Sequence, residues 1–197
     1  MILKVNLKDM QSGCLTTLVV IDRICSENNL RYYLVGGTML GAVRHGGFIP
    51  WDDDIDIAMP RMDYERFLEI ASTELPDDYY IQTQRLGNYP IHFAKVVDRR
   101  TTVVEKSLKH RGYQTGLFVD VFPLDGVPSN RIGRRVHYGR IRLYLQTISG
   151  HYFWDEQTKA KYSGLKKWGR LAARRLTKAI PSFVMRKIHG RVEGLLK

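Results

Sequence analysis

A glycine pair followed closely by an acidic segment constrains the fold of this chain more than any other feature. The aromatic and apolar residues 32–35 predict a short strand, which Gly36 and Gly37 break before a segment of helical composition at 39–44. Glycine lets the backbone approach a ligand closely, and the first amides of a helix have no partners inside it. Gly36, Gly37 and Thr38 therefore predict a turn that binds phosphate, although a glycine pair alone is more often an ordinary turn.

The acidic segment alternates carboxylate and apolar side chains from Asp54 onward. Because side chains of a strand alternate between its faces, Ile55 and Ile57 would face the core while Asp54 and Asp56 share the other face. Two carboxylates on one face are ligands that a hard cation such as Mg²⁺ or Mn²⁺ prefers. The alternative is a solvated acidic turn, which the apolar alternation and the upstream glycines disfavour.

A third carboxylate is expected from a neighbouring strand, and Asp120 is the best candidate. It lies in the otherwise apolar run 116–125, where an unpaired buried charge would be costly. A bound metal would remove that cost. The open alternatives are that Asp120 caps a turn or pairs with an arginine. Asp52 and Asp53 are interpreted as acids additional to the Asp54 and Asp56 pair.

These residues resemble a known family. The run at 36–57 is similar to the signature of the LicD family, the phosphorylcholine transferases that include the fukutin-like proteins, and it reads GGTMLGAVRHGGFIPWDDDIDI. Further matches lie at 61–67, 94–98 and 118–125, and the resemblance covers roughly residues 7–130. It implies a nucleotidyltransferase-like fold and metal-dependent transfer of a phospho-alcohol, such as phosphocholine. The donor would be a CDP-alcohol, and the acceptor a sugar hydroxyl of a cell-surface glycan, free or lipid-linked, such as lipopolysaccharide, teichoic acid or capsule.

The resemblance also implies site residues. Carried over by position, the metal-binding and catalytic acids are Asp54, Asp56 and Asp120, and the donor-phosphate turn is Gly36, Gly37 and Thr38. Arg44 and Lys95 are the cations nearest to these elements in the sequence, and a donor pyrophosphate needs guanidinium or ammonium partners. We expect Asp120 to take the proton from the attacking hydroxyl.

Composition and charge divide the chain into two parts. With 197 residues and 44% hydrophobic content, the chain can bury one substantial core. Residues 131–197 contain 17 Lys or Arg and 3 Asp or Glu, a net charge of +14 within a total of +11, so residues 1–130 carry −3. We therefore predict an α/β (α+β) catalytic domain at 1–130, with a small mixed sheet flanked by helices, and a basic helical region at 131–197.

Periodicity predicts the individual elements. Helices are expected at 7–25, from Met62 to Ile70, and at 131–149, 159–180 and 182–196. Strands are expected at 79–82, 92–97, 101–105 and 117–122.

The sequence also suggests where the protein resides. It has no run of 18 apolar residues and no charged segment before an apolar stretch at its start, so we expect neither a membrane span nor a signal peptide. Cys14 and Cys25 lie on one predicted helix, roughly 16 Å apart along its axis, which is too far for a disulfide. Free thiols favour the cytoplasm. The basic amphipathic helix at 159–180 indicates peripheral contact with an anionic membrane, or else only a solvated basic face.

Two other functions remain open. A nucleotidyltransferase that places NMP on an acceptor would use the same fold geometry. A non-catalytic basic module could bind membrane or nucleic acid, but nucleic acid is disfavoured because residues 131–197 lack a recognisable pattern of basic groups interleaved with exposed aromatics.

Overall fold

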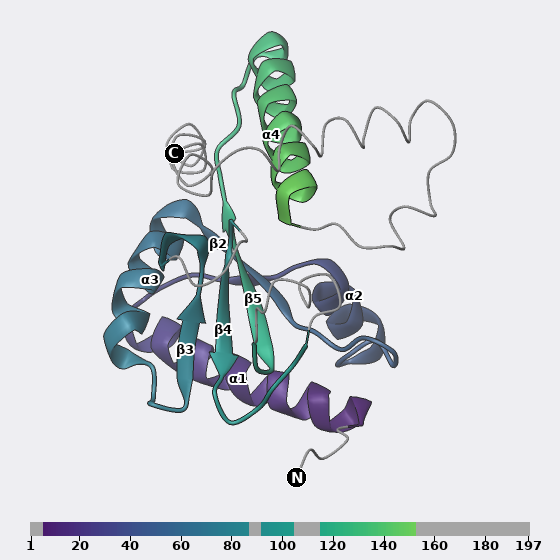
Figure 1. Cartoon of the computed structure of the whole chain (residues 1–197), viewed down its shortest axis with the longest axis vertical. Helices are drawn as coiled ribbons and strands as arrows, with labels where there is room; N and C mark the ends of the chain where they lie inside the picture. The colour runs from purple at the N-terminus through teal and green to yellow at the C-terminus, as the bar shows by residue number, and fades with distance from the viewer. Residues whose placement is uncertain (1–5, 87–91, 105–114, 153–197) are drawn as a thin grey trace. The chain divides into compact units, whose positions relative to one another are not determined.

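The computed structural model describes residues 6–86, 92–104 and 115–152 (Figure 1). Its helices are α1 (Leu7–Glu27), α2 (Gly36–His45), α3 (Arg61–Glu74) and α4 (Arg131–Tyr152), with a short 3-10 turn η1 (Gln84–Leu86). Its strands are β1 (Tyr33–Leu34), β2 (Asp56–Pro60), β3 (Tyr79–Gln82), β4 (Ala94–Asp98) and β5 (Phe118–Leu124). The chain divides into two compact units, and among the described residues the division falls between Leu124 and Asp125. The predicted boundary after residue 130 lies in the connection between β5 and α4.

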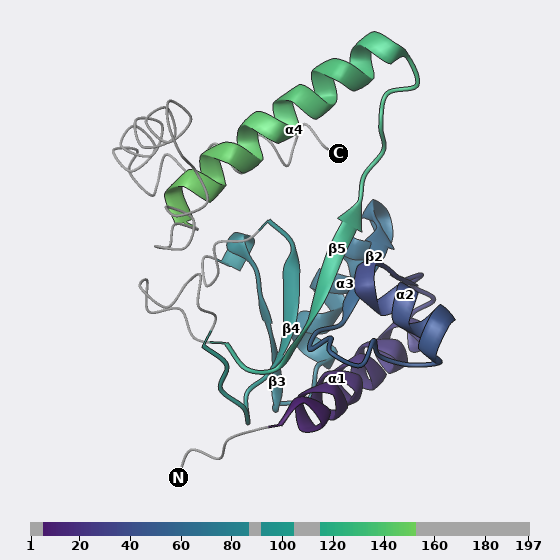
Figure 2. The same ribbon diagram turned by 90° about the vertical axis from the view of Figure 1, so that its right-hand side faces the viewer.

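The first unit contains a five-stranded mixed sheet in the order β1-β2-β5-β4-β3. β2 and β5 are parallel, whereas the other neighbouring pairs are antiparallel. β4 lies between β3 and β5 (Figure 2). The predicted α/β fold with a small mixed sheet flanked by helices is confirmed.

One face of the sheet carries the core. Its strand residues recur at alternate positions, as expected for side chains that share a face, and Ile55 continues this pattern just before β2. They are Ile57, Met59, Tyr79, Ile81, Ala94, Val96, Val119 and Val121. Two helices cover this face, α1 through Cys14, Ile21 and Ile24, and α3 through Tyr64, Phe67 and Ala71. In Figure 1, α1 runs across the strands.

Local signals explain the first helix. The side chain of Asn6 accepts a hydrogen bond from the amide of Asp9 at 3.0 Å, which caps the N-terminus of α1. The predicted apolar stripe through Cys14, Ile21 and Cys25 is buried. Both cysteines are free thiols, as predicted.

Other predicted elements differ in extent. The strand expected at 101–105 contributes, within its described part, an isolated bridge between Val103 and Thr115. Thr101 instead closes a turn, since its hydroxyl donates to the Asp98 carbonyl and accepts from the Leu117 amide. The helix expected at 131–149 is α4, and those expected at 159–180 and 182–196 lie outside the described residues.

Candidate metal and phosphate site

A polar row crosses the sheet on the face opposite the core. Cross-strand register pairs Asp56 of β2 with Asp120 of β5, Asp120 with Lys95 of β4, and Lys95 with Gln82 of β3. Because residues paired across strands point to the same face, these four side chains form one row. The prediction that Asp120 lies on a strand beside the acidic strand is confirmed.

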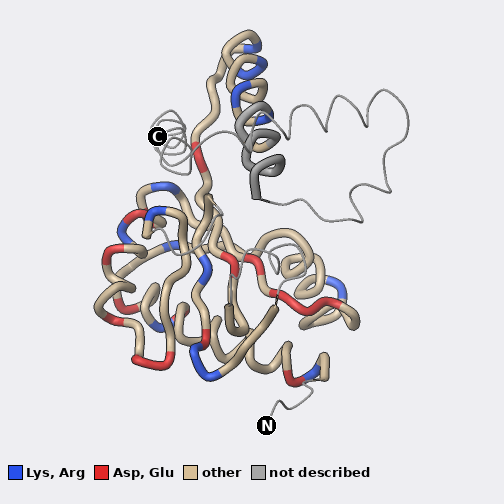
Figure 3. Tube along the Cα trace, in the orientation of Figure 1, with Lys and Arg blue, Asp and Glu red and all other residues tan. Residues whose placement is uncertain are grey.

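The acids that precede β2 gather at one end of this row. Asp54 lies two residues before Asp56, and the intervening Ile55 is buried, so the predicted alternation is present although β2 itself begins only at Asp56. The carboxylates of Asp52, Asp53 and Asp54 lie within 4.8 Å of one another. Figure 3 shows acidic positions gathered in the segment between α2 and β2. Asp52 and Asp53, interpreted from the sequence as additional acids, thus lie close to Asp54.

The charges of these carboxylates affect one another. The pKa of Asp54 rises to about 6, chiefly because of burial and then because of the negative charges of Asp56 and Asp52. The pKa of Asp56 is also raised, first by burial and then by Asp52, while Lys95 acts in the opposite direction on both groups. The arrangement thus concentrates hard oxygen ligands whose mutual repulsion a divalent cation would relieve, and this donor set fits Mg²⁺ or Mn²⁺.

Asp120 has a different environment from the other acids. Its Oδ1 lies 3.1 Å from Nζ of Lys95, and both residues are buried, Lys95 with 2% of its surface exposed. The same ammonium lies 3.2 Å from the centre of the Phe118 ring. Asp120 therefore pairs with a lysine. Lys95, a predicted phosphate ligand, contacts Asp120 in this structure.

The predicted phosphate turn is the first turn of α2. Val35 is its N-cap, and Gly36 has a φ of +57°, which favours glycine. The amide of Val35 donates to the Asp56 carbonyl at 3.1 Å, and the amide of Asp56 donates to Thr38 Oγ1 at 2.8 Å. Gly36, Gly37 and Thr38 are thus brought against the acidic strand, as the sequence suggested.

Arg44 lies elsewhere on the same helix. It is exposed in the last turn of α2, at the opposite end from Gly36. The chain then returns along α2, and a Cβ on Gly41 would lie 2.5 Å from the carbonyl oxygen of Gly47. This close return brings Asp52 back to the first turn of the helix, where a Cβ on Gly37 would lie 2.6 Å from Asp52 Oδ2.

Sequence reasoning missed two contributors to this region. Gln82 is buried at the far end of the polar row, and the assignment of 79–82 to a strand was the signal that could have aligned it with Lys95. Gln11 donates from Nε2 to the carbonyl of Asp52 at 2.8 Å and so holds the acidic loop against α1. Nothing in the pattern of the opening helix distinguishes Gln11.

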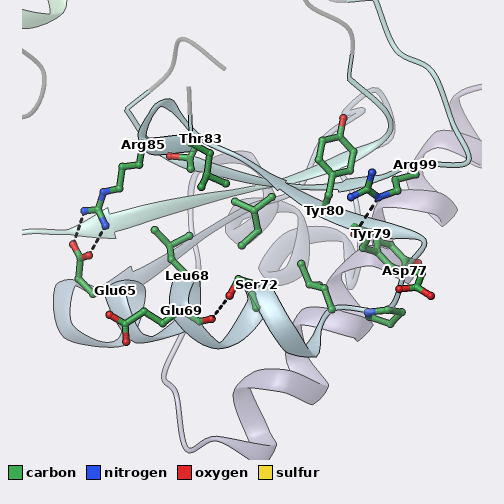
Figure 4. Close-up of a pocket in the computed structure, with 15 residues that line it drawn as sticks. Glu65, Leu68, Glu69, Ser72, Asp77, Tyr79, Tyr80, Thr83, Arg85 and Arg99 are labelled. Carbon is green, nitrogen blue, oxygen red and sulfur yellow. Dashed lines mark hydrogen bonds and ion pairs between the residues drawn. The ribbon is translucent and has the colours of Figure 1, made fainter. Parts of the chain in front are cut away.

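A separate pocket of about 540 Å³ lies between α3 and β3 (Figure 4). Leu68 and Ile81 contribute apolar surface, and Arg85 donates two hydrogen bonds to the Glu65 carboxylate beside it. Its lining contains none of the clustered acids and neither member of the Lys95–Asp120 pair. The pocket is therefore distinct from the candidate metal site.

Asp56 and Asp120 pair across two parallel strands, beside a helix that begins with two glycines. Together with the neighbouring acids they form a cluster of oxygen donors of the kind that fits a divalent cation. Residues 29–140 match the family described as LicD/FKTN/FKRP, nucleotidyltransferase domain. Because this match covers more than half of the chain, the chain belongs to that family. The resemblance noted in the sequence is thereby confirmed.

Three relatives illustrate the family. The chain is 38% identical over 128 residues to the lipopolysaccharide cholinephosphotransferase LicD of Haemophilus influenzae, a match that covers 64% of this chain and 47% of the relative. It is 50% identical over 65 residues to an uncharacterized protein of Rickettsia prowazekii, covering 33% of this chain and 24% of that protein. It is 57% identical over 30 residues to the human ribitol 5-phosphate transferase FKRP, covering 15% and 6%. The chain therefore spans less than half the length of each of these relatives.

No helix in the described part of the chain combines the length and apolar character needed to cross a membrane.

Proposed function

We propose that this protein transfers a phospho-alcohol from a CDP-linked donor to a sugar hydroxyl of a cell-surface glycan, with Mg²⁺ or Mn²⁺ as cofactor. Family membership supports this proposal, as do the names of two relatives, one a cholinephosphotransferase acting on lipopolysaccharide and the other a ribitol 5-phosphate transferase. These two names share a phospho-alcohol as the group transferred. Product analysis with different donors and glycans distinguishes the alcohol transferred, and distinguishes lipopolysaccharide, teichoic acid and capsule as acceptors.

The acidic cluster beside β2 is the observation that carries the proposal. Asp54 and Asp56 would hold the metal, and Asp52 would join them, because its carboxylate lies within 4.8 Å of that of Asp54. When bound, a divalent ion would neutralise charge on the donor pyrophosphate as the bond to the CMP leaving group stretches. The predicted ligand Asp120 remains a proposed ligand, from the neighbouring strand.

The residues of the polar row have proposed roles in the transfer itself. Asp120 would accept the proton of the attacking sugar hydroxyl, as positioned carboxylates do in general base catalysis. Its ion pair with Lys95 fixes the position of that carboxylate on the sheet. Lys95 adds a positive charge near the donor phosphates. Arg44 is a proposed donor ligand only if the donor extends along α2, since its side chain lies at the far end of the helix.

The proposed surroundings of the enzyme follow from charge. The five arginines of α4, Arg131, Arg134, Arg135, Arg140 and Arg142, are all exposed. Each Lys or Arg near an anionic leaflet contributes about 1 kcal/mol to membrane association. We therefore propose a cytoplasmic protein with peripheral contact at the inner face of the membrane, where a lipid-linked acceptor would be reached. Co-sedimentation with anionic vesicles should exceed that with neutral vesicles and should fall with salt.

Product analysis tests the proposed reaction. The protein is incubated with Mg²⁺, a cell-envelope glycan extract and either a panel of CDP-alcohols or NTPs, and the glycans are analysed by mass spectrometry. We expect a mass increase equal to one phospho-alcohol, and none with the Asp54→Asn variant. An increase equal to one NMP would instead support the nucleotidyltransferase alternative, and no increase with any donor would contradict both.

A further inference from the structure

Both backbone polar groups of Asp56 are held by the segment that begins α2. The amide of Asp56 donates to the Thr38 hydroxyl oxygen at 2.8 Å, and its carbonyl accepts from the Val35 amide at 3.1 Å. Thr38 follows Val35 by three residues, so one short segment binds the acid on both sides of its Cα atom. The position of this proposed metal ligand therefore depends on the first turn of α2.

The two glycines of that turn make room for carboxylates. A Cβ on Gly36 would lie 3.0 Å from Asp56 Oδ2, and a Cβ on Gly37 would lie 2.6 Å from Asp52 Oδ2. The second distance is shorter than real Cβ contacts allow. Since the atom that it meets is the end of an aspartate side chain, an alanine at Gly37 would displace that carboxylate while leaving the backbone in place.

The same contacts argue against a phosphate in direct contact with this turn. The carboxylates of Asp52 and Asp56 lie against the first residues of α2, where the unpaired amides of a helix would otherwise attract an anion. A donor phosphate at that point would meet two negative charges. The N-terminus of α2, which is the positive end of its dipole, instead lies beside the protein's own carboxylates.

We propose that Gly36, Gly37 and Thr38 are positioning residues for the carboxylates of Asp56 and Asp52, and not direct ligands of the donor phosphates. The inference rests on the proposed function, because it assigns these residues to the metal of that same site. The two roles require different groups of these residues. A phosphate turn needs the backbone amides, whereas a positioning segment needs the absent Cβ of Gly37 and the hydroxyl oxygen of Thr38.

Binding of Mn²⁺ in the absence of any donor distinguishes a positioning role from a phosphate-binding role for these residues. Free Mn²⁺ is measured by electron paramagnetic resonance during titration of the whole chain and of the variants Gly37→Ala, Thr38→Val and Thr38→Ser. The matched control is Gly47→Ala, because a Cβ at Gly47 meets nothing within 4 Å. Circular dichroism and thermal melting report whether each variant is folded.

We expect Gly37→Ala and Thr38→Val to weaken Mn²⁺ binding by about 10- to 100-fold, the usual effect of removing a group that orients a metal ligand. Thr38→Ser keeps the oxygen and should bind within about threefold of wild type, as should Gly47→Ala. Gly37→Ala retains its amide, so unchanged Mn²⁺ affinity in a folded Gly37→Ala protein would overturn the inference. If Thr38→Val does not fold, the comparison of Gly37→Ala with Gly47→Ala still decides it.

The outcome for the wild-type protein distinguishes two kinds of failure. Saturable Mn²⁺ binding by wild type together with equal binding by the variants would overturn only the positioning role. The absence of saturable binding by wild type, with or without a CDP-alcohol, would instead contradict the metal-dependent function on which the inference rests.

Discussion

The two faces of one sheet differ in what their side chains do, although they alternate along the same strands. On the core face, residues such as Ile57 and Val119 are fully buried against α1 and α3. On the opposite face, Asp56, Asp120 and Lys95 form the polar row, and the acidic loop adjoins it. Because adjacent residues of one strand belong to different faces, neighbouring substitutions should separate folding from catalysis.

The largest expected effect is on catalysis. Asp54→Asn and Asp56→Asn should each lower turnover by on the order of 10³-fold or more, because each removes the charge of a proposed metal ligand. Far-ultraviolet circular dichroism should remain that of wild type. Near wild-type turnover by either folded variant would remove these acids from the site.

The Asp54→Asn substitution should also stabilise the metal-free protein. The folded-state pKa of Asp54 is about 6, above its ordinary value of 3.8, so the fold binds this proton more tightly than the unfolded chain does. The contribution of Asp54 to the free energy of unfolding is therefore largest below pH 3.8, and it is lost as the pH rises through about 6. We therefore expect Asp54→Asn to melt at a higher temperature than wild type at pH 7 in EDTA. Added Mg²⁺ should raise the melting temperature of wild type more than that of the variant.

The second effect is on folding but arises on the face that carries the polar row. Lys95→Met would leave the Asp120 carboxylate buried without its ammonium partner, and we expect a loss of about 3 to 5 kcal/mol in the free energy of unfolding. Urea denaturation measures this loss. The double variant Lys95→Met/Asp120→Asn should recover most of the stability, and failure to recover would show that packing of Lys95 on Phe118 matters more than the charge pair.

The core face gives the third effect. Ile57→Ala should cost about 2 to 5 kcal/mol in the free energy of unfolding, because Ile57 is fully buried. Its immediate neighbour Asp56 points to the other face, so turnover per folded molecule should stay within a few fold of wild type. A loss of turnover comparable with that of Asp56→Asn would mean that the two faces are not independent.

Arg44 should have the smallest effect. It is exposed at the end of α2 away from the acids, and an exposed charge contributes at most about 1 kcal/mol. Arg44→Ala should therefore weaken CDP-alcohol binding by less than about fivefold, as measured by calorimetry, with Arg44→Lys between it and wild type. A larger loss would indicate that the donor extends along the helix.

The sequence predicted those helices and strands whose apolar residues recur at a regular spacing. The apolar stripe of α1, the alternation around Ile55 and the strand at 79–82 are all visible in short windows of sequence. In β4 all five residues are buried, so periodicity alone could not show that Lys95 faces the site while Val96 faces the core. The acidic pattern and the family resemblance pointed to Asp54, Asp56 and Asp120, but not to the pairing of Asp120 with Lys95.

The missed features depend on contacts between distant segments. The pairing of Lys95 with Asp120 follows from the register of β4 against β5, which no short window contains. Asp52 lies in a loop without periodicity, and its approach to Gly37 depends on the path of the chain after α2. The positive φ of Gly36 is likewise a consequence of how α2 meets β2.

The close return of the chain along α2 has a consequence for how this segment can vary. The loop after α2 packs against the helix at two places, where Gly41 lies against the backbone of Gly47 and Gly37 lies against Asp52. The length of the loop is therefore fitted to the length of the helix. One residue inserted or deleted between Gly41 and Asp52 would shift the acids relative to the helix without replacing any of them. The tolerance of this stretch to changes in length should therefore be lower than its tolerance to exchanges of its exposed side chains, such as Val43 and Trp51.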